Sequence, residues 1–233
     1  MSQYLYKKEF TCPVCENKFQ SSVVRNSMVR LAKRDTDLFR YYKNINPYYY
    51  EIKVCPRCGF AFSEHSTLGL DYEVKKNFYN SVSKHWNSVD YCGERSLKEA
   101  IATFKLALLA AQITNEKLSV RGNYCLRLCW LNRLDENHEE EMRFMKSAFS
   151  AFEESYQTED NKGIKVMKPE VMLYMLGELS FRLQNYADTK KWFSIALGEC
   201  TKNPFIDAKI KDIIRDRWMD IKYEIFHENH ENI

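Results

Sequence analysis

From about residue 70 onward, apolar residues recur every three or four positions, which is the spacing of helices that bury one face. Few glycine or proline residues interrupt this pattern. Helix-breaking signals between the periodic stretches set the expected ends. The pattern predicts seven helices, at about 70–88, 95–114, 117–133, 137–158, 169–184, 187–201 and 206–228.

The first 65 or so residues have a different pattern, in which short segments alternate with turns. Lys7–Thr11 and Lys18–Arg25 flank a tight turn and are predicted to pair as a hairpin. Inward and outward positions alternate along residues 48–54, and this period of two predicts a half-buried strand that runs into Cys55.

Consecutive predicted helices pair into units of about 35–45 residues, a length typical of helical repeats. Gly177 would let the next helix approach closely, and Phe193 and Ala196 would fill the space between the two. This alternation of large and small residues is typical of a tetratricopeptide helix pair. An irregular helical bundle with the same apolar faces is the alternative.

Two Cys-Pro-x-Cys turns are the strongest chemical signal in the chain. They are Cys12–Cys15 and Cys55–Cys58, separated by 39 residues, and we call each turn a knuckle. Two knuckles supply Cys12, Cys15, Cys55 and Cys58 as four thiolates, a set that favours tetrahedral Zn²⁺ and leaves no coordination position for a substrate. The sequence therefore predicts a structural zinc ion and a zinc ribbon.

Other interpretations of these cysteines remain open. Iron in the same geometry, two redox-active dithiols and structural disulfides are the alternatives. The second knuckle ends in Gly59, which permits the positive φ of such a turn, whereas the first has Glu16 there. We therefore expect the first turn to be more strained or differently shaped. Cys125 and Cys129, four apart on one helix, are interpreted as buried small hydrophobic residues.

These patterns together predict an α+β fold, mainly α. A small zinc-ribbon β domain at residues 1–68 is followed by a tetratricopeptide-like helical array at residues 69–233. We expect His85 and Trp86, near the end of the first predicted helix, to pack against the ribbon.

Two further runs accompany the knuckles, Val29–Asp37 and Tyr41–Tyr50. With the knuckles, they resemble a bacterial family of uncharacterised cytosolic proteins that join a zinc-ribbon-like N-terminus to a helical, tetratricopeptide-like region. Glu16 replaces the glycine usual in that family. The resemblance implies the fold and the metal site, and it implies no activity because the family has no established one.

A polar and aromatic group beside the ribbon forms a candidate binding surface. The alternative, which we favour, is a salt-bridged turn in which aspartates cap backbone N–H groups. The candidate residues are Arg34, Asp35, Asp37, Tyr41, Tyr42 and Asn46.

The tyrosines of this region are interleaved with basic residues and are able to stack on nucleic-acid bases. Residues 1–65 carry 11 Lys or Arg against 6 Asp or Glu, which suits an anionic partner. The alternative, which we favour, is that these aromatic side chains build the core of the small domain. The tyrosines concerned are Tyr41, Tyr42, Tyr48, Tyr49 and Tyr50.

Composition and missing motifs narrow the function. Hydrophobic content of 45% and charged content of 29% indicate a folded chain. No apolar run approaches the length of a membrane span and no secretory leader is evident, so we expect a cytoplasmic protein without membrane contact. Catalytic signatures are missing, so we expect no enzyme. The sequence favours a scaffold for a protein or peptide partner, and the alternative is a nucleic-acid-binding protein.

Overall fold

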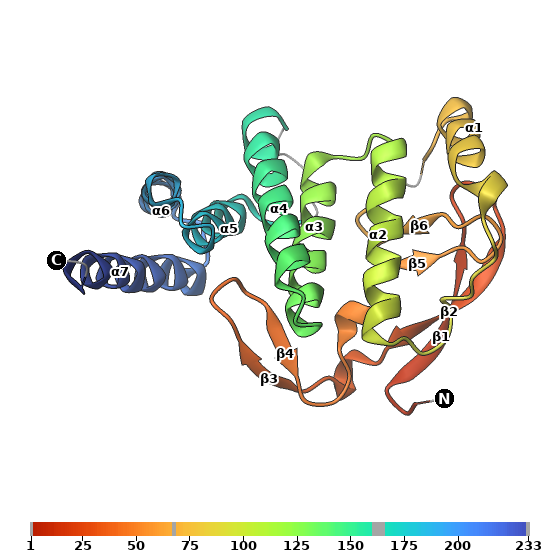
Figure 1. Ribbon diagram of the computed structural model, residues 1–233, viewed down its shortest axis with the longest axis horizontal. Coiled ribbons are helices and arrows are strands. Elements are labelled where there is room, and N and C mark those ends of the chain that lie inside the picture. The colour runs from red at the N-terminus through yellow and green to blue at the C-terminus, as the bar shows by residue number, and fades with distance from the viewer. Residues whose placement is uncertain (1, 67–68, 160–165, 232–233) are drawn as a thin grey trace. The chain divides into compact units, whose positions relative to one another are not determined.

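The fold is that of a computed structural model, which describes residues 2–66, 69–159 and 166–231, with side chains described as far as residue 225. Small antiparallel strands come first and helices follow, which confirms the predicted α+β, mainly helical class (Figure 1). The strands are β1 (Leu5–Thr11), β2 (Lys18–Val24), β3 (Leu31–Arg34), β4 (Arg40–Tyr42), β5 (Lys53–Val54) and β6 (Ala61–Phe62). The helices within the described residues are α1 (Tyr72–Ser81), α2 (Leu97–Ile113), α3 (Leu118–Leu134), α4 (His138–Thr158), α5 (Pro169–Arg182), α6 (Tyr186–Lys202) and α7 (Ala208–Glu231).

The chain divides into two compact units, Met1–Ala151 and Phe152–Ile233. The boundary predicted after residue 68 falls inside the first unit, and residues 67 and 68 lie outside the described residues. The division into domains at 1–68 and 69–233 therefore stays a prediction.

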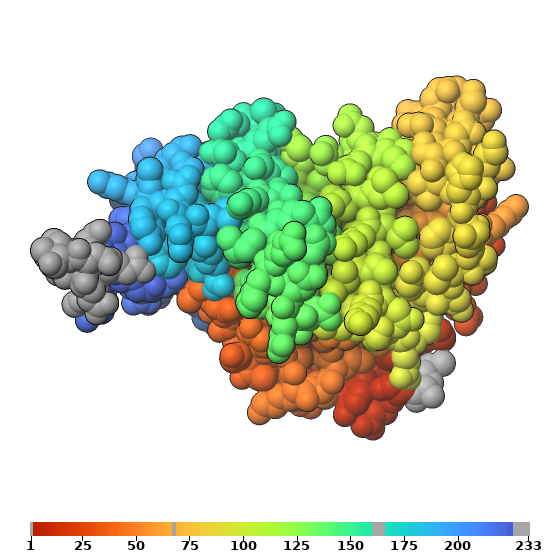
Figure 2. All heavy atoms as spheres, viewed as in Figure 1, coloured from red at the N-terminus to blue at the C-terminus, as the bar shows by residue number. Residues whose placement is uncertain are grey.

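The strands of the first unit form three separate two-stranded antiparallel sheets. β1 pairs with β2 from Leu5 opposite Val24 to Thr11 opposite Lys18, which confirms the predicted hairpin. Two-stranded sheets are marginal alone and need a packing partner. β6 and the segment before β5 contact α2, and Figure 2 shows the strand-rich atoms (red to orange) directly against the helices that follow (yellow to green).

The prediction of a strand along residues 48–54 is wrong in its secondary structure. Pro47–Tyr50 forms a short 3-10 helix, and only Lys53–Val54 is a strand. Pro47 fixes the φ of the first helical position, and the Asn46 side chain accepts a hydrogen bond from the Tyr48 N–H at 3.1 Å, so the turn is capped. The even-numbered positions are nevertheless buried, at Tyr48, Tyr50, Ile52 and Val54.

The helices lie close to their predicted positions, and only the first differs substantially. α1 ends at Ser81, and a 3-10 turn at Ser83–His85 follows it. α2 begins with a capping box, in which the Ser96 side chain accepts from the Glu99 N–H and the Glu99 carboxylate accepts from the Ser96 N–H. This reciprocal cap stabilises the first turn of α2 and so fixes the residue at which the helix begins.

In the second unit, α5 and α6 pack together where Gly177 faces Phe193. A Cβ added at Gly177 would lie 2.6 Å from the Phe193 ring, closer than real contacts allow. Phe193 and Ala196 are fully buried between the helices. The predicted close approach at Gly177 is therefore confirmed, while the regular tetratricopeptide repeat stays a prediction.

Replacing Gly177 with Ala should destabilise the second unit by about 1–3 kcal/mol, because the added methyl group overpacks a fully buried ring. Gly198→Ala is the matched control, since its Cβ would meet nothing within 4 Å. It should stabilise α6 by about 0.5–1 kcal/mol through helix propensity. Chemical denaturation of both full-length variants measures the difference, and equal effects would contradict the packing argument.

Candidate metal centre

The two knuckles have the same backbone hydrogen bonds. In the first, the Glu16 N–H donates to the Cys12 carbonyl at 3.0 Å, and the Cys12 N–H donates to the Asn17 carbonyl at 3.0 Å. In the second, the Gly59 N–H donates to the Cys55 carbonyl at 2.9 Å. These bonds close each turn, so both cysteines of a knuckle are held on one side of it.

The two knuckles also share a left-handed residue at the equivalent position. Gly59 has φ of 75° and Glu16 has φ of 59°, so the expectation of a differently shaped first turn is wrong. The expected strain is present instead, since a left-handed conformation at a residue with a side chain raises its conformational free energy by about 1–2 kcal/mol. The surrounding hairpin imposes this conformation on Glu16.

The four sulfur atoms converge on one point. Cys12 Sγ lies 3.5 Å from Cys58 Sγ, and Cys15 Sγ lies 3.6 Å from Cys55 Sγ, so sulfurs of different knuckles are in contact. All four atoms lie within 4.8 Å of one another. A tetrahedron with Zn–S bonds of about 2.3 Å has edges of about 3.8 Å. The donor set therefore fits a single tetrahedral ion.

The cysteine group belongs to the core of the first unit. Cys12 and Cys55 are fully buried, and Cys58 is nearly so. Side chains from β2, β6, α1 and α2 complete the same core, among them Phe19, Phe60, Phe62, Phe78 and Ala110. The metal group is therefore continuous with the packing between the strands and the helices.

Trp86 covers the second knuckle. Its Nε1 donates to the Pro56 carbonyl at 3.0 Å, and a Cβ at Gly59 would lie 2.6 Å from the indole ring. Gly59 is thus required both for its positive φ and for this close approach. The expectation that Trp86 packs against the ribbon is confirmed.

The clustered thiols perturb one another's ionisation. Hydrogen bonds from Cys12 and Cys58 lower the pKa of Cys55, while the hydrogen bond with Cys55 raises the pKa of Cys12. Hydrogen bonds with Cys12 and Cys55, together with burial, raise the pKa of Cys58. Neighbouring thiolates repel one another, so ionisation of all four would require a cation bound among them.

The remaining cysteines stand apart from this group. Cys92 packs against the same core, but its Sγ faces the Val54 carbonyl at 3.9 Å. Burial raises the pKa of Cys92 and of Cys125 to about 11, which makes both thiols poorly reactive. Cys125 and Cys129 are buried on α3, in agreement with their interpretation as small hydrophobic residues.

Asp35 and Asp37 of the candidate surface form the salt-bridged turn that was the favoured alternative. Asp37 is fully buried and accepts hydrogen bonds from Trp130 Nε1 at 3.0 Å and Arg133 Nη2 at 2.7 Å. Its other oxygen accepts from the Phe39 N–H at 3.2 Å. Asp35 accepts from Arg133 Nη1 at 3.1 Å. Both aspartates therefore tie the β3–β4 hairpin to α3.

The other candidate surface residues have separate surroundings. Arg34 is exposed, while Tyr41 packs edge-on against Phe39 with ring centroids 4.6 Å apart. Tyr42 packs against Tyr48, and Asn46 caps the following 3-10 helix. A shared binding surface of Arg34, Asp35, Asp37, Tyr41, Tyr42 and Asn46 stays a prediction, in which Asp37 would act from inside the protein.

Sequence reasoning missed Arg133, which joins three carboxylates. Besides Asp35 and Asp37, it donates to Glu141 Oε1 at 2.6 Å. Burial alone would lower the pKa of Arg133, but the hydrogen bond and charge of Asp37 raise it above its usual value. No sequence signal links Arg133 to the hairpin, because the two are almost a hundred residues apart.

Replacing Arg133 with Met should destabilise the first unit by about 3–5 kcal/mol, because the buried Asp37 carboxyl group would lose its cationic partner. Arg143→Met is the control, since Arg143 forms an exposed pair with Glu140 and should cost less than about 1 kcal/mol. Urea unfolding of the two variants compares the losses. Similar small losses would show that Asp37 does not depend on Arg133.

Fold and site together define an α+β protein with a buried four-cysteine candidate metal centre and a mainly helical remainder. The chain belongs to the family described as uncharacterized proteins conserved in bacteria (DUF2225), which it matches over residues 5–221. This confirms the resemblance seen in the sequence. No solved structure matches the chain.

A relative in Borreliella burgdorferi, named as an uncharacterized protein, is 28% identical over 187 residues. The match covers 71% of this chain and 58% of the relative, so the chain spans less than two thirds of that protein. Within the described residues, none of the helices combines the length and apolar character needed to span a bilayer.

Proposed function

We propose that the four cysteines bind one structural Zn²⁺. The observation that carries this proposal is the convergence of four sulfurs, from two turns with matching backbone hydrogen bonds, to within 4.8 Å of one another. Four thiolates suit Zn²⁺ and fill a tetrahedral coordination shell, which leaves no position for a substrate. The ion would be held by Cys12, Cys15, Cys55 and Cys58, and it would cross-link the two knuckles.

The zinc ion would fix the strand-rich segment on the helices of the first unit. Each knuckle lies between the paired strands of a hairpin, β1–β2 for the first and β5–β6 for the second. These hairpins bury little surface alone. A metal link between them closes a long loop and therefore offsets a large entropy of closure.

Replacing Cys55 with Ser should lower the zinc content of the purified full-length chain from about one ion to well below one, because one of four ligands is lost. The first unit should also unfold at lower temperature. Cys92→Ser is the control, since Cys92 lies in the same core but is not among the converging sulfurs. Elemental analysis measures the metal, and iron in place of zinc, or no metal in the wild type, would refute the proposal.

We propose that the protein acts as a cytoplasmic binding scaffold and not as an enzyme, with a protein or peptide segment as its partner. Support comes from the second unit, where large apolar side chains are solvent-exposed. Phe205 is 95% exposed, Tyr223 68% and Met219 59%. Exposed apolar side chains mark protein interaction sites where they gather into one patch, and the proposal requires this of the three residues.

A nucleic-acid partner is the second candidate, and one feature of the β3–β4 hairpin favours it. Arg34 lies directly opposite Arg40, and both are exposed. Like charges at opposite positions destabilise a hairpin unless an anion joins them. The tyrosines support this candidate less, because Tyr48 and Tyr50 are buried.

The two partner classes are separable with full-length variants. If the partner is a protein, the double variant Phe205→Ser, Tyr223→Ser should no longer cross-link to it. The control Tyr79→Ser should still do so, since Tyr79 is an exposed aromatic residue (57%) on α1. For nucleic acid, Arg34→Gln with Arg40→Gln should weaken binding to single-stranded or duplex oligonucleotides and reduce its salt dependence. If the first pair of changes has no effect and the second abolishes binding, the protein scaffold is refuted in favour of nucleic acid.

A further inference from the structure

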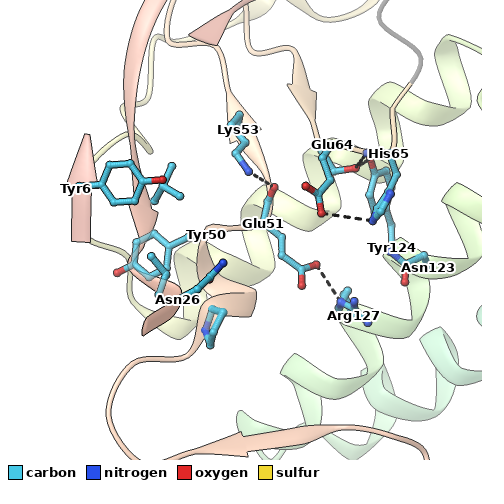
Figure 3. A pocket seen from close by; sticks show the side chains of 14 residues that line it. Tyr6, Asn26, Tyr50, Glu51, Lys53, Glu64, His65, Asn123, Tyr124 and Arg127 are labelled. Carbon is cyan, nitrogen blue, oxygen red and sulfur yellow. Dashed lines mark hydrogen bonds and ion pairs between the residues drawn. The ribbon is translucent and has the colours of Figure 1, made fainter. Parts of the chain in front are cut away.

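The first unit contains a cavity of about 280 Å³ between the strand-rich segment and α3. Its walls come from β1, β2, the Pro47–Lys53 segment, the residues after β6, and α3 (Figure 3). Tyr6 and Tyr50 form an aromatic wall on one side, and Tyr124 lies on the other (Figure 3). The volume is at the small end of pockets that bind small molecules.

Asn123 on α3 supplies an unused polar group to this cavity. Asn123 is 4% exposed and lines the cavity, and its amide, which is not among the fully enclosed polar groups, makes no hydrogen bond to a described residue. An amide that faces a cavity hydrogen-bonds water there, and a ligand that displaces this water must replace its hydrogen bonds. A ligand in the cavity would therefore need a polar group beside this amide.

Lys53 supplies a cation from the opposite wall. Its Nζ donates to the Glu51 backbone carbonyl at 2.9 Å, and no carboxylate of the described residues lies within ion-pair distance of it. An ammonium group carries three donors, and besides this bond the group lies 5.5 Å from the Phe10 ring centroid, so at least one donor remains for a ligand. A half-buried ammonium group without a counter-ion favours an anion that reaches it.

The other charged groups around the cavity are paired or solvent-exposed. The Glu51 carboxylate accepts from Arg127 Nε at 2.9 Å, so these two charges neutralise each other. Glu64 is 84% exposed and lies 3.8 Å from His65 at the rim, where water screens its charge. Lys53 is therefore the un-neutralised charge on the inner wall.

We propose that this cavity is a binding site for a small molecule that carries an oxyanion, either a carboxylate or a phosphate. The oxyanion pairs with the Lys53 ammonium group, and a second polar group of the ligand hydrogen-bonds the Asn123 amide. The tyrosine rings contact the apolar part of the molecule. The site is separate from the four-cysteine group, and the proposal requires neither a particular metal nor a particular macromolecular partner.

Titration of the full-length protein with inorganic phosphate and, separately, with acetate tests this site. The Asn123 side-chain amide signal in nuclear magnetic resonance spectra should shift saturably with at least one anion, and the stronger anion identifies the oxyanion class. Lys53→Met should weaken that binding at least about tenfold, because one charge-assisted hydrogen bond is lost. Glu64→Gln should change it little, because water already screens that charge at the rim.

Lys8→Met is the matched control. Lys8 lies over the same Phe10 ring as Lys53 but does not line the cavity, so its removal changes the nearby charge equally and should leave the affinity within about twofold. If Lys53→Met fails to fold, Asn123→Asp replaces it, since a carboxylate there should repel the anion; calorimetry then follows binding, because this variant lacks the amide signal. No saturable shift with either anion, or equal losses in the Lys8 and Lys53 variants, would refute the site.

Discussion

Four thiol groups from turns 39 residues apart must meet in the core of the first unit, and the arrangement of that unit follows from this constraint. Each knuckle lies within its own hairpin, so bringing the sulfurs together also brings the hairpins together. Phe78 of α1 and Ala110 of α2 pack on the same group. The strands are too few to form a core among themselves, and they become ordered by sharing one with the helices.

A second link, between Asp37 and Arg133, holds the β3–β4 hairpin, which lies outside the cysteine core. The two links differ in their physical basis. A four-thiolate site gains stability from coordination bonds, whereas a buried ion pair repays the desolvation of its charges only when every donor and acceptor is satisfied. Asp37 meets that condition through Trp130, Arg133 and the Phe39 N–H. The ion pair therefore fixes the position of the hairpin more than it adds to stability.

Local patterns explain which features were predictable from the sequence. The helices and the first hairpin are encoded by spacing within each segment, and the knuckles by adjacent cysteines. Residues 48–54 show where prediction from such patterns fails. Alternating burial is compatible with a strand and also with a 3-10 turn followed by an extended segment. Here the Asn46 cap and Pro47 favour the turn. The conformation of Glu16 was also not predictable from local sequence, since the hairpin imposes a left-handed conformation that a glutamate itself disfavours.

Contacts between segments far apart in the chain could not be predicted from the sequence. Arg133 and Asn123 look like ordinary polar positions on α3, and only the folded chain places one beside Asp37 and the other in a cavity. The Pro47–Lys53 segment, one wall of that cavity, runs between the β3–β4 hairpin and Cys55. Both of its ends are thus anchored, one near the Asp37–Arg133 pair and the other at the second knuckle. Anchoring at both ends reduces the freedom that Lys53 would lose on binding the proposed anion, so the four-cysteine centre would contribute to affinity without touching the ligand.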